Sequence, residues 1–329
     1  PFQSPIMTQT ASLKSNKKIV VIGGGTGVFN LLSGLKDYFD KLSAIVTMAD
    51  DGGSTGILRE EFGILPPGDV RRALVALSRS DNKTMSELFN YRFKEGKGLA
   101  GHAFGNLMIT ALERITGSFE KAVDEAGRIL SIQGEVIPVT TMPTHLVAEL
   151  ENGQIVRGET NIDIPRHDGK LKIKSIRLEP KATLNPRAGK AVAEADIVVI
   201  GPGDLYTSLL PNLLAEGMTD ALKKTKAKVI YFVNAMTKYG ETHGFTASKF
   251  VEVMEQHVGK SVVDYVAINT AKPSAARLKP YAQENSWFVE VDEENLDPKP
   301  VPLYADLIRS RGFIRHDPEK TATLLKLIS

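Results

Sequence analysis

The sequence of 329 residues predicts an α/β protein with a doubly wound, mostly parallel sheet and a β-rich insertion in the middle of the chain. Short apolar runs rich in β-branched residues alternate with amphipathic helical patterns, which is typical of strands buried by helices on both faces of a parallel sheet. Between residues 134 and 180 this alternation gives way to short strands, which predicts the insertion. We therefore expect one domain over residues 19–329.

A strand–helix–strand unit opens the predicted domain. Residues 19–22 form an apolar run, a helical pattern extends to residue 35, and residues 44–48 form a second apolar run. Asp69 follows two prolines and a glycine and is predicted to cap a helix that extends to residue 77. Further helices are predicted at residues 86–93, 106–115 and 119–130.

The insertion and the closing part follow. The insertion is predicted to contain strands at residues 136–139, 146–150, 155–156 and 171–178. The Glu151-Asn152-Gly153 segment between two of them is typical of a hairpin turn. Alternation then resumes with predicted strands at 197–200, 229–233 and 265–268, and predicted helices at 205–214, at 247–257 and from about 318.

Charge and composition argue against several classes of protein. Forty-one basic and 39 acidic residues give a net charge of +2 without a long basic run, unlike a typical nucleic-acid-binding protein. The absence of cysteine excludes disulfides, cysteine-ligated metals and a cysteine nucleophile, and it fits a cytoplasmic protein. No apolar run approaches the roughly 20 residues of a membrane span, and the start lacks a signal-peptide pattern.

Residues 1–18 are polar and lack periodicity. We interpret them as a disordered tail in which residues 1–6 are a vector remnant and Met7 is the natural start. A basic arm made by Lys14, Lys17 and Lys18 is the alternative.

A glycine-rich loop follows the first predicted strand, at the sheet edge where ligands of parallel sheets bind. Its candidate ligand-binding residues are Gly24, Gly25, Thr26 and Gly27. Glycines there let the backbone approach an anion at a helix N-terminus, although a tight turn is the alternative. Val28 stands where the dinucleotide fingerprint needs its third glycine, and no Gly-Lys-Ser/Thr follows, which argues against standard NAD binding and a P-loop.

Two further loops of this kind precede predicted helices. The loop at 201–208 offers Gly201, Gly203, Asp204, Tyr206, Thr207 and Ser208. Asp204 either caps the helix or faces the ligand. The loop at 99–107 offers His102 and Asn106, and His102 is either structural or functional. Three phosphate-compatible loops on one sheet predict a phosphorylated, nucleotide-bearing ligand.

An acidic turn and a polar loop complete the candidate site. The turn contributes Asp50, Asp51, Gly52, Gly53 and Ser54, and the loop after residues 229–233 contributes Asn234, Thr237, Glu241 and Thr242. Asp50 and Asp51 are candidate Mg²⁺ ligands together with waters and ligand phosphates. Alternatively, one of them hydrogen-bonds a sugar hydroxyl, or both only stabilise the turn.

Six segments in order resemble a known family: GGGTG (23–27), ADDGGSTG (49–56), LPPGDVRRALVALS (65–78), GHAFGNL (101–107), IGPGDLYTSLLPNLL (200–214) and NAMTKYGETHGFTAS (234–248). The chain resembles the bacterial gluconeogenesis factors from residue 18 to about residue 319. That family is related to the 2-phospho-L-lactate transferases of deazaflavin-coenzyme biosynthesis. The resemblance implies a Rossmann-like domain, a cytoplasmic location, self-association and a nucleotide-type ligand.

The resemblance implies two alternative functions. The first is a regulatory protein that binds a UDP-sugar such as UDP-N-acetylglucosamine, contacts a protein partner, and is needed for cell shape and for growth on gluconeogenic carbon sources. The second is a Mg²⁺-dependent transferase with a nucleotide-diphosphate donor. The Gly-Pro-Gly-Asp-Leu-Tyr-Thr-Ser loop favours the first, because the transferases carry a Ser-Asn-Pro type sequence there. Asp204 departs from the serine usual in that branch.

Two late residues also match the motifs of this family. Tyr281 in Lys-Pro-Tyr-Ala and Arg315 in Ile-Arg-His-Asp stand where the family reaches the nucleotide. Tyr281 can stack on a pyrimidine ring, and Arg315 can stack or bind a phosphate through two hydrogen bonds.

Overall fold

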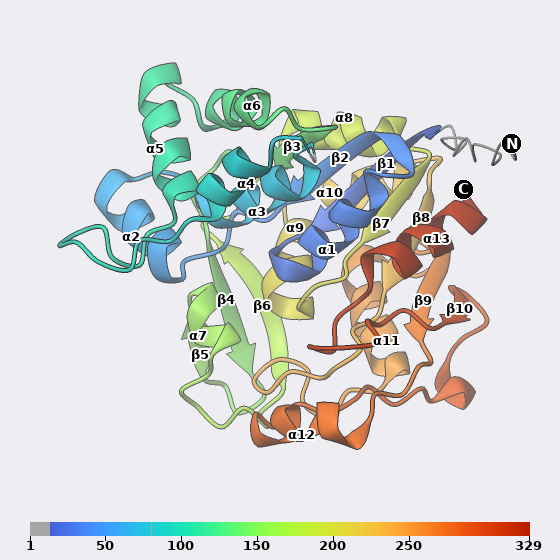
Figure 1. Cartoon of the computed structure of the whole chain (residues 1–329). Helices are drawn as coiled ribbons and strands as arrows, with labels where there is room; N and C mark the ends of the chain where they lie inside the picture. Colours follow the sequence, from blue (N-terminus) through green and yellow to red (C-terminus); the bar gives the residue numbers. More distant parts are fainter. Residues whose placement is uncertain (1–13, 80) are drawn as a thin grey trace, which may run out of the picture.

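The computed structural model of the chain describes residues 14–79 and 81–329 (Figure 1). In these residues the centre of the molecule is a seven-stranded parallel sheet. In spatial order its strands are β10 (Val301–Ala305), β9 (Tyr265–Asn269), β8 (Lys228–Phe232), β7 (Ile197–Ile200), β1 (Ser15–Gly23), β2 (Phe39–Val46) and β3 (Glu135–Pro138). From β3 this is the doubly wound order 3-2-1-4-5-6 with one strand added, which confirms the predicted fold class.

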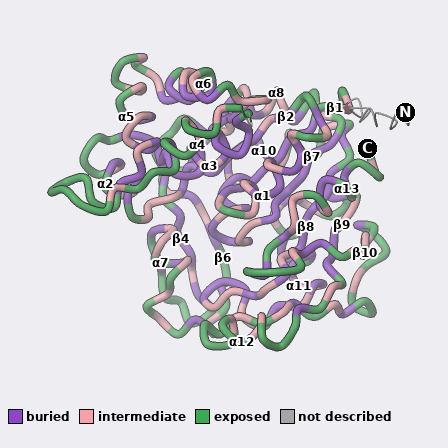
Figure 2. The backbone as a smooth tube through the Cα atoms, viewed as in Figure 1, coloured by how far each residue is buried: buried purple, intermediate pink, exposed green. Residues whose placement is uncertain are grey.

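Helices cover both faces of the sheet because its strands are apolar throughout. One face carries α1 (Gly25–Leu35), packed between α3 (Pro67–Leu77) and α13 (Pro318–Ile328). The other carries α8 (Pro186–Glu194), α9 (Leu210–Leu213), α10 (Met218–Lys224) and α11 (Ala247–Val258). Figure 2 shows the resulting core as buried strands inside a more exposed shell.

Four more helices lie near the β3 edge or follow the acidic turn. They are α2 (Gly53–Phe62), α4 (Lys83–Asn90), α5 (Phe104–Thr116) and α6 (Phe119–Leu130). The last segment before β10 contains α12 (Ala275–Gln283). Within the part of the chain that the structure describes, no helix has the length and apolar character needed to cross a membrane.

The insertion is smaller than predicted. It contains an antiparallel sheet with the order β5 (Ile155–Arg157), β4 (His145–Leu150) and β6 (Ile173–Glu179), together with the short helix α7 (Glu159–Asp163). The predicted strand at 136–139 does not belong to it. That segment is β3, which pairs in parallel with β2 and is an edge strand of the large sheet. A four-residue apolar strand gives no local sign of its partner, so the sequence could not separate the two sheets.

Some predicted boundaries were wrong. β1 begins at Ser15, four residues before residue 19, because it pairs with β2 from there onward. The rest of the predicted tail, apart from Lys14, lies outside the described residues. The predicted helix at 205–214 is a π-helical turn over Leu205–Leu209 followed by α9, and the Leu209 N–H donates to the Asp204 carbonyl at 3.0 Å.

Asp69 does not cap α3. That helix begins two residues earlier, at Pro67, whose fixed φ and missing N–H suit the first helical position. Asp69 therefore lies in the first turn of the helix, where its carboxylate is buried and ion-paired with Arg72 at 3.0 Å.

Candidate functional site

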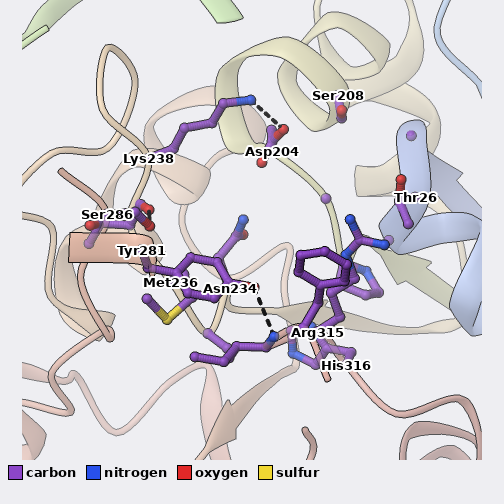
Figure 3. A pocket seen from close by; sticks show the side chains of 18 of the residues that line it. Thr26, Asp204, Ser208, Asn234, Met236, Lys238, Tyr281, Ser286, Arg315 and His316 are labelled. Atoms are coloured by element: carbon purple, nitrogen blue, oxygen red, sulfur yellow. Dashed lines mark hydrogen bonds and ion pairs between the residues drawn. The ribbon is translucent and has the colours of Figure 1, made fainter. Parts of the chain in front are cut away.

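The main cavity lies where the strand order of the sheet reverses, between β1 and β7. At such a position the loops that leave the two strands diverge and a crevice opens, which is where doubly wound folds bind their ligands. This cavity, called the large chamber here, has a volume of about 1020 Å³ (Figure 3). The predicted residues that line it are Gly24, Gly25, Thr26, Gly27, Gly203, Asp204, Ser208, Asn234, Thr237, Tyr281 and Arg315.

The glycine loop after β1 positions the start of α1 against the loop after β7. Gly25 has a φ of +66°, a left-handed conformation that favours glycine. A Cβ atom on Gly27 would lie 2.2 Å from the carbonyl oxygen of Pro202, so a side chain there would push the two loops apart. The Gly25 N–H donates to Asp69 Oδ1 at 3.0 Å. The N–H groups of Thr26 and Gly27 belong to the first turn of α1, where N–H groups lack partners within the helix.

Asp204 is a counter-ion and not a helix cap. Its side chain makes no cap hydrogen bond, and its Oδ2 lies 2.8 Å from Lys238 Nζ. The same ammonium pairs with Asp163 of α7 and lies 3.5 Å from Glu241 Oε1. These four residues are called the lysine cluster here. Burial alone would lower the pKa of Lys238, but the three carboxylates outweigh it and raise that pKa, so the lysine stays charged.

The lysine cluster also bears on the predicted Mg²⁺. Carboxylate oxygens of Asp163, Asp204 and Glu241 lie within 4.8 Å of one another, a spacing that could hold a metal ion. The Lys238 ammonium already pairs with all three, so the set does not fit a resident metal ion.

Asp50 and Asp51 do not face the same space. Asp51 accepts hydrogen bonds from the backbone N–H groups of Glu159 at 3.1 Å and Thr160 at 2.9 Å, so it fastens α7 of the insertion to the loop after β2. Asp50 accepts from the Gly52 N–H at 3.0 Å and lines a second cavity. This geometry gives no joint metal site at the two residues.

Two buried polar atoms in the wall of the large chamber have no hydrogen-bond partner in the described part of the chain. They are Asn234 Oδ1 and His316 Nε2. Burial lowers the pKa of His316 to about 4, so its ring is neutral at pH 7. Buried polar atoms are normally hydrogen-bonded, so these two atoms call for a partner, which a water molecule or a ligand could supply.

An aromatic side chain and an arginine from the C-terminal third complete the chamber. The Ile314 N–H donates to the Tyr281 hydroxyl oxygen at 2.8 Å, which ties α12 to the segment before α13. The Arg315 guanidinium lies 5.0 Å from the centre of the Phe313 ring. Figure 3 shows Tyr281 and Arg315 in the chamber with Asn234 and His316. The structure therefore brings the two late predicted residues to the glycine loops.

A second cavity of about 400 Å³, called the small chamber here, adjoins the first. The two share lining residues: Gly25, Thr26, Asp163, Ile164, Asp204, Ser208 and Lys238. Of the other predicted residues, the small chamber is lined by Asp50, Gly52, Gly53, Ser54, Asn106 and Thr207. It is also lined by Asp69, which was predicted only as a helix cap, and by charged residues that the sequence did not single out: Arg71, Arg72, Arg92 and Glu159.

Two acids of the small chamber, Glu159 and Asp50, have raised pKa values. Burial raises the pKa of Glu159 to about 9, and the negative charges of Asp50 and Asp163 add to the effect. Burial and the neighbouring Asp69 also raise the pKa of Asp50. At pH 7 Glu159 is therefore protonated and adds no negative charge to the chamber.

Six predicted residues line neither chamber: Asp51, His102, Gly201, Tyr206, Glu241 and Thr242. Four of them hydrogen-bond to residues that do: Asp51, His102, Glu241 and Thr242. His102 Nδ1 lies 3.0 Å from Ser54 Oγ, which fits the structural alternative for this histidine. The Tyr206 N–H donates to Glu241 Oε2 at 3.0 Å, which holds the π-helical turn against the loop after β8.

The residues that the sequence analysis missed differ in the signal they gave. Arg71 and Lys238 stand inside the segments at 65–78 and 234–248 that carry the family resemblance, but their partners lie elsewhere in the chain. His316 directly follows Arg315, which the sequence analysis had named as a candidate. Asp163 gave no signal, because it reaches the site from a five-residue helix of the insertion.

Comparison with known proteins agrees with this geometry. The family model described as "2-phospho-L-lactate transferase CofD" matches residues 19–308. The chain belongs to the CofD family. A relative of this CofD-family protein from Nostoc sp. is 46% identical, over 94% of this chain and 68% of its own length. A relative from Halalkalibacterium halodurans, named gluconeogenesis factor, is 42% identical over 93% of this chain and 94% of its own.

A solved structure from Bacillus halodurans is also similar. It is described as a member of the UPF0052 family, and it matches the CofD-family protein with a TM-score of 0.89 and 39% identity. The match covers 95% of this chain and 99% of that one. The expected resemblance to gluconeogenesis factors and to the transferase family is thus confirmed over most of the chain.

Proposed function

We propose that this CofD-family protein binds a nucleotide sugar of the UDP-N-acetylglucosamine type in the large chamber and acts as a cytoplasmic regulatory protein. The observation that carries the proposal is the pair of unpartnered buried atoms, Asn234 Oδ1 and His316 Nε2, in one wall of that chamber. Neutral donors and acceptors of this kind match the edge of a base or the hydroxyls of a ribose. The volume of about 1020 Å³ is at the upper end for small-molecule sites.

In this proposal the two ends of the nucleotide meet different walls. The base stacks on Tyr281, with Arg315 beside it, and the neutral polar atoms contact the base and ribose. The diphosphate lies at the N-terminus of α1, near Thr26 and Gly203, because a helix start attracts anions. The ion pair with Lys238 reduces the repulsion between Asp204 and that diphosphate.

The names of the relatives support a role in gluconeogenic growth, and the proposal includes the effect on cell shape. A regulator needs a second contact that its ligand changes. We therefore include a homo-oligomer and a protein partner in the proposal, with light scattering of the purified protein as the check on the oligomer.

The alternative is a transferase with a nucleotide-diphosphate donor. The family description favours it, and so does the small chamber, which adjoins the proposed diphosphate position and has room for an acceptor or leaving group. The occupied lysine cluster and the engaged Asp51 count against the Mg²⁺ that this reading predicts.

Calorimetric titration separates the two functions. UDP-N-acetylglucosamine and GDP are each titrated with and without Mg²⁺, and the ligand is recovered afterwards. The proposal predicts that the UDP-sugar binds more tightly, that Mg²⁺ is not required, and that the ligand is recovered intact. Preferential, Mg²⁺-dependent binding of GDP, or turnover of the UDP-sugar, would favour the transferase.

A further inference from the structure

The small chamber contains a buried arginine that forms no ion pair in the described part of the chain. Arg71 of α3 is only 6% exposed and lines the chamber. Its Nε donates to Asn106 Oδ1 at 3.0 Å and its Nη1 to Asn90 Oδ1 at 2.5 Å, and both acceptors are neutral amides. In residues 14–79 and 81–329, no carboxylate lies within the 4.0 Å ion-pair distance of Arg71. Buried charges in proteins are normally paired, so Arg71 lacks an expected anion.

Two carboxylates of the chamber, Asp69 and Asp50, act on Arg71 only from beyond ion-pair distance. Asp69 is committed to Arg72 at 3.0 Å and to the Gly25 N–H. Arg92 is exposed and donates to the Gly101 carbonyl, so it adds positive charge. Burial, together with Arg72 and Arg92, lowers the pKa of Arg71 to about 10 against the opposing effect of Asp69 and Asp50, and the guanidinium is still charged at pH 7. The protonated Glu159 can donate a hydrogen bond to an anion instead of repelling it.

We propose that the small chamber is a second binding site, for a carboxylate or phosphate group, with Arg71 as the main contact. A planar guanidinium held by two amides is preorganised for the two oxygens of such a group. The oxyanion has two possible sources. It is either part of the same ligand, attached beyond the diphosphate, or a separate small anion that binds beside the nucleotide.

Because the two chambers adjoin, one ligand can extend from the large chamber into the small one. Gly25, Thr26 and Ser208 line both cavities, so a diphosphate at the start of α1 directs its next group toward Arg71. In that case the inference rests on the proposed nucleotide function and specifies its substrate class as an anionic nucleotide sugar. A separate anion needs no nucleotide at all.

The sharpest variant gives Arg71 an internal partner. Asn90 is exposed at the end of α4, so Asn90→Asp places a carboxylate next to the guanidinium without emptying the core. The new carboxylate competes with any bound anion. Arg71→Met is a second variant, used only if its unfolding temperature matches the wild type. Asn152→Asp, in the exposed hairpin turn of the insertion, is the matched control for one added negative charge.

Three titrations of the whole chain decide between the outcomes. Titration with UDP alone measures binding in the large chamber. The difference in affinity between UDP-glucuronic acid and UDP-glucose measures recognition of an attached carboxylate. Inorganic phosphate, added to the free and to the UDP-saturated protein, measures binding of a separate anion. We expect either a preference for UDP-glucuronic acid or phosphate binding in the wild type. Asn90→Asp should reduce that preference or that binding about tenfold. UDP affinity should stay unchanged, and Asn152→Asp should behave as the wild type.

The failures are distinguishable. If UDP does not bind, the proposed function is wrong, while phosphate binding to the free protein still supports the anion site. If UDP binds but the wild type shows neither the carboxylate preference nor phosphate binding, the anion site is wrong. It is also wrong if Asn90→Asp retains wild-type affinity for both anions.

Discussion

The two chambers of the cleft share a wall but differ in the chemistry of their linings. The large chamber presents an aromatic ring, a neutral histidine and an amide oxygen, with Arg315 at its side. The small chamber presents three arginines, several carboxylates, and the protonated Glu159. The difference indicates that one end of the ligand is recognised by stacking and neutral hydrogen bonds, and the other by charge.

The lysine cluster lies between the two chambers and connects three parts of the chain. Lys238 follows β8, Asp204 follows β7, and Asp163 belongs to the insertion. The cluster therefore fastens the insertion to the large sheet at the shared wall.

The largest expected effect comes from removing the ammonium of this cluster. Lys238→Met leaves three carboxylates close together, one of them fully buried, and should lower the free energy of unfolding by about 3 kcal/mol. Urea denaturation checks this, with the exposed Lys272→Met as control. Added Mg²⁺ should stabilise Lys238→Met more than the wild type, because the carboxylates are then free to bind it. An unchanged unfolding free energy would show that the cluster does not hold the shared wall.

The second effect tests whether the His316 side chain in the wall of the large chamber is neutral. The pKa of His316 is about 4 in the folded protein and about 6.5 in an unfolded chain, so the unfolded chain takes up the proton first as the pH falls. The contribution of His316 is therefore fully present above pH 6.5 and is lost toward pH 4. At pH 5 the loss of this contribution should lower the free energy of unfolding by about 2 kcal/mol relative to pH 7.

Thermal unfolding between pH 7 and pH 4 checks the histidine. His316→Gln should flatten the profile, while the exposed His145→Gln should keep it. Identical slopes for the wild type and His316→Gln would mean that the ring is already charged or solvated, and the contrast between the chambers would be lost.

A smaller effect tests stacking in the large chamber. Tyr281→Ala should weaken UDP binding by about 1–3 kcal/mol, the scale of base stacking on aromatic residues. Tyr281→Phe keeps the ring and removes only the hydrogen bond from the Ile314 N–H, so it should lose much less. Calorimetric titration with UDP measures both variants. If both variants lost the same UDP affinity, Tyr281 would contribute through its hydroxyl and not through stacking of its ring.

The smallest effect tests whether Asp51 has a structural role or binds a metal ion. Asp51→Ala removes two hydrogen bonds to the start of α7 and should cost about 1 kcal/mol of stability, the scale of a lost helix cap. It should weaken nucleotide binding equally with and without Mg²⁺, as titration under both conditions would reveal. A loss confined to Mg²⁺-containing buffer would instead make Asp51 a metal ligand.

The sequence predicted those features that depend on local patterns. The glycine loops after β1 and β7 were found because strand, glycine and helix signals follow one another directly. The lysine cluster and the unpaired Arg71 were missed because their meaning depends on partners far along the chain. Arg71 lies 35 residues from Asn106, and Lys238 lies 75 residues from Asp163. No periodicity or motif encodes such pairs.

The most direct test of the account is the crystal structure of the protein with UDP-N-acetylglucosamine. The account predicts the base on Tyr281, hydrogen bonds from the ligand to Asn234 and His316, and the diphosphate at the start of α1 with the sugar toward the small chamber. A ligand bound elsewhere, or one that leaves Asn234 Oδ1 and His316 Nε2 without partners, would contradict it.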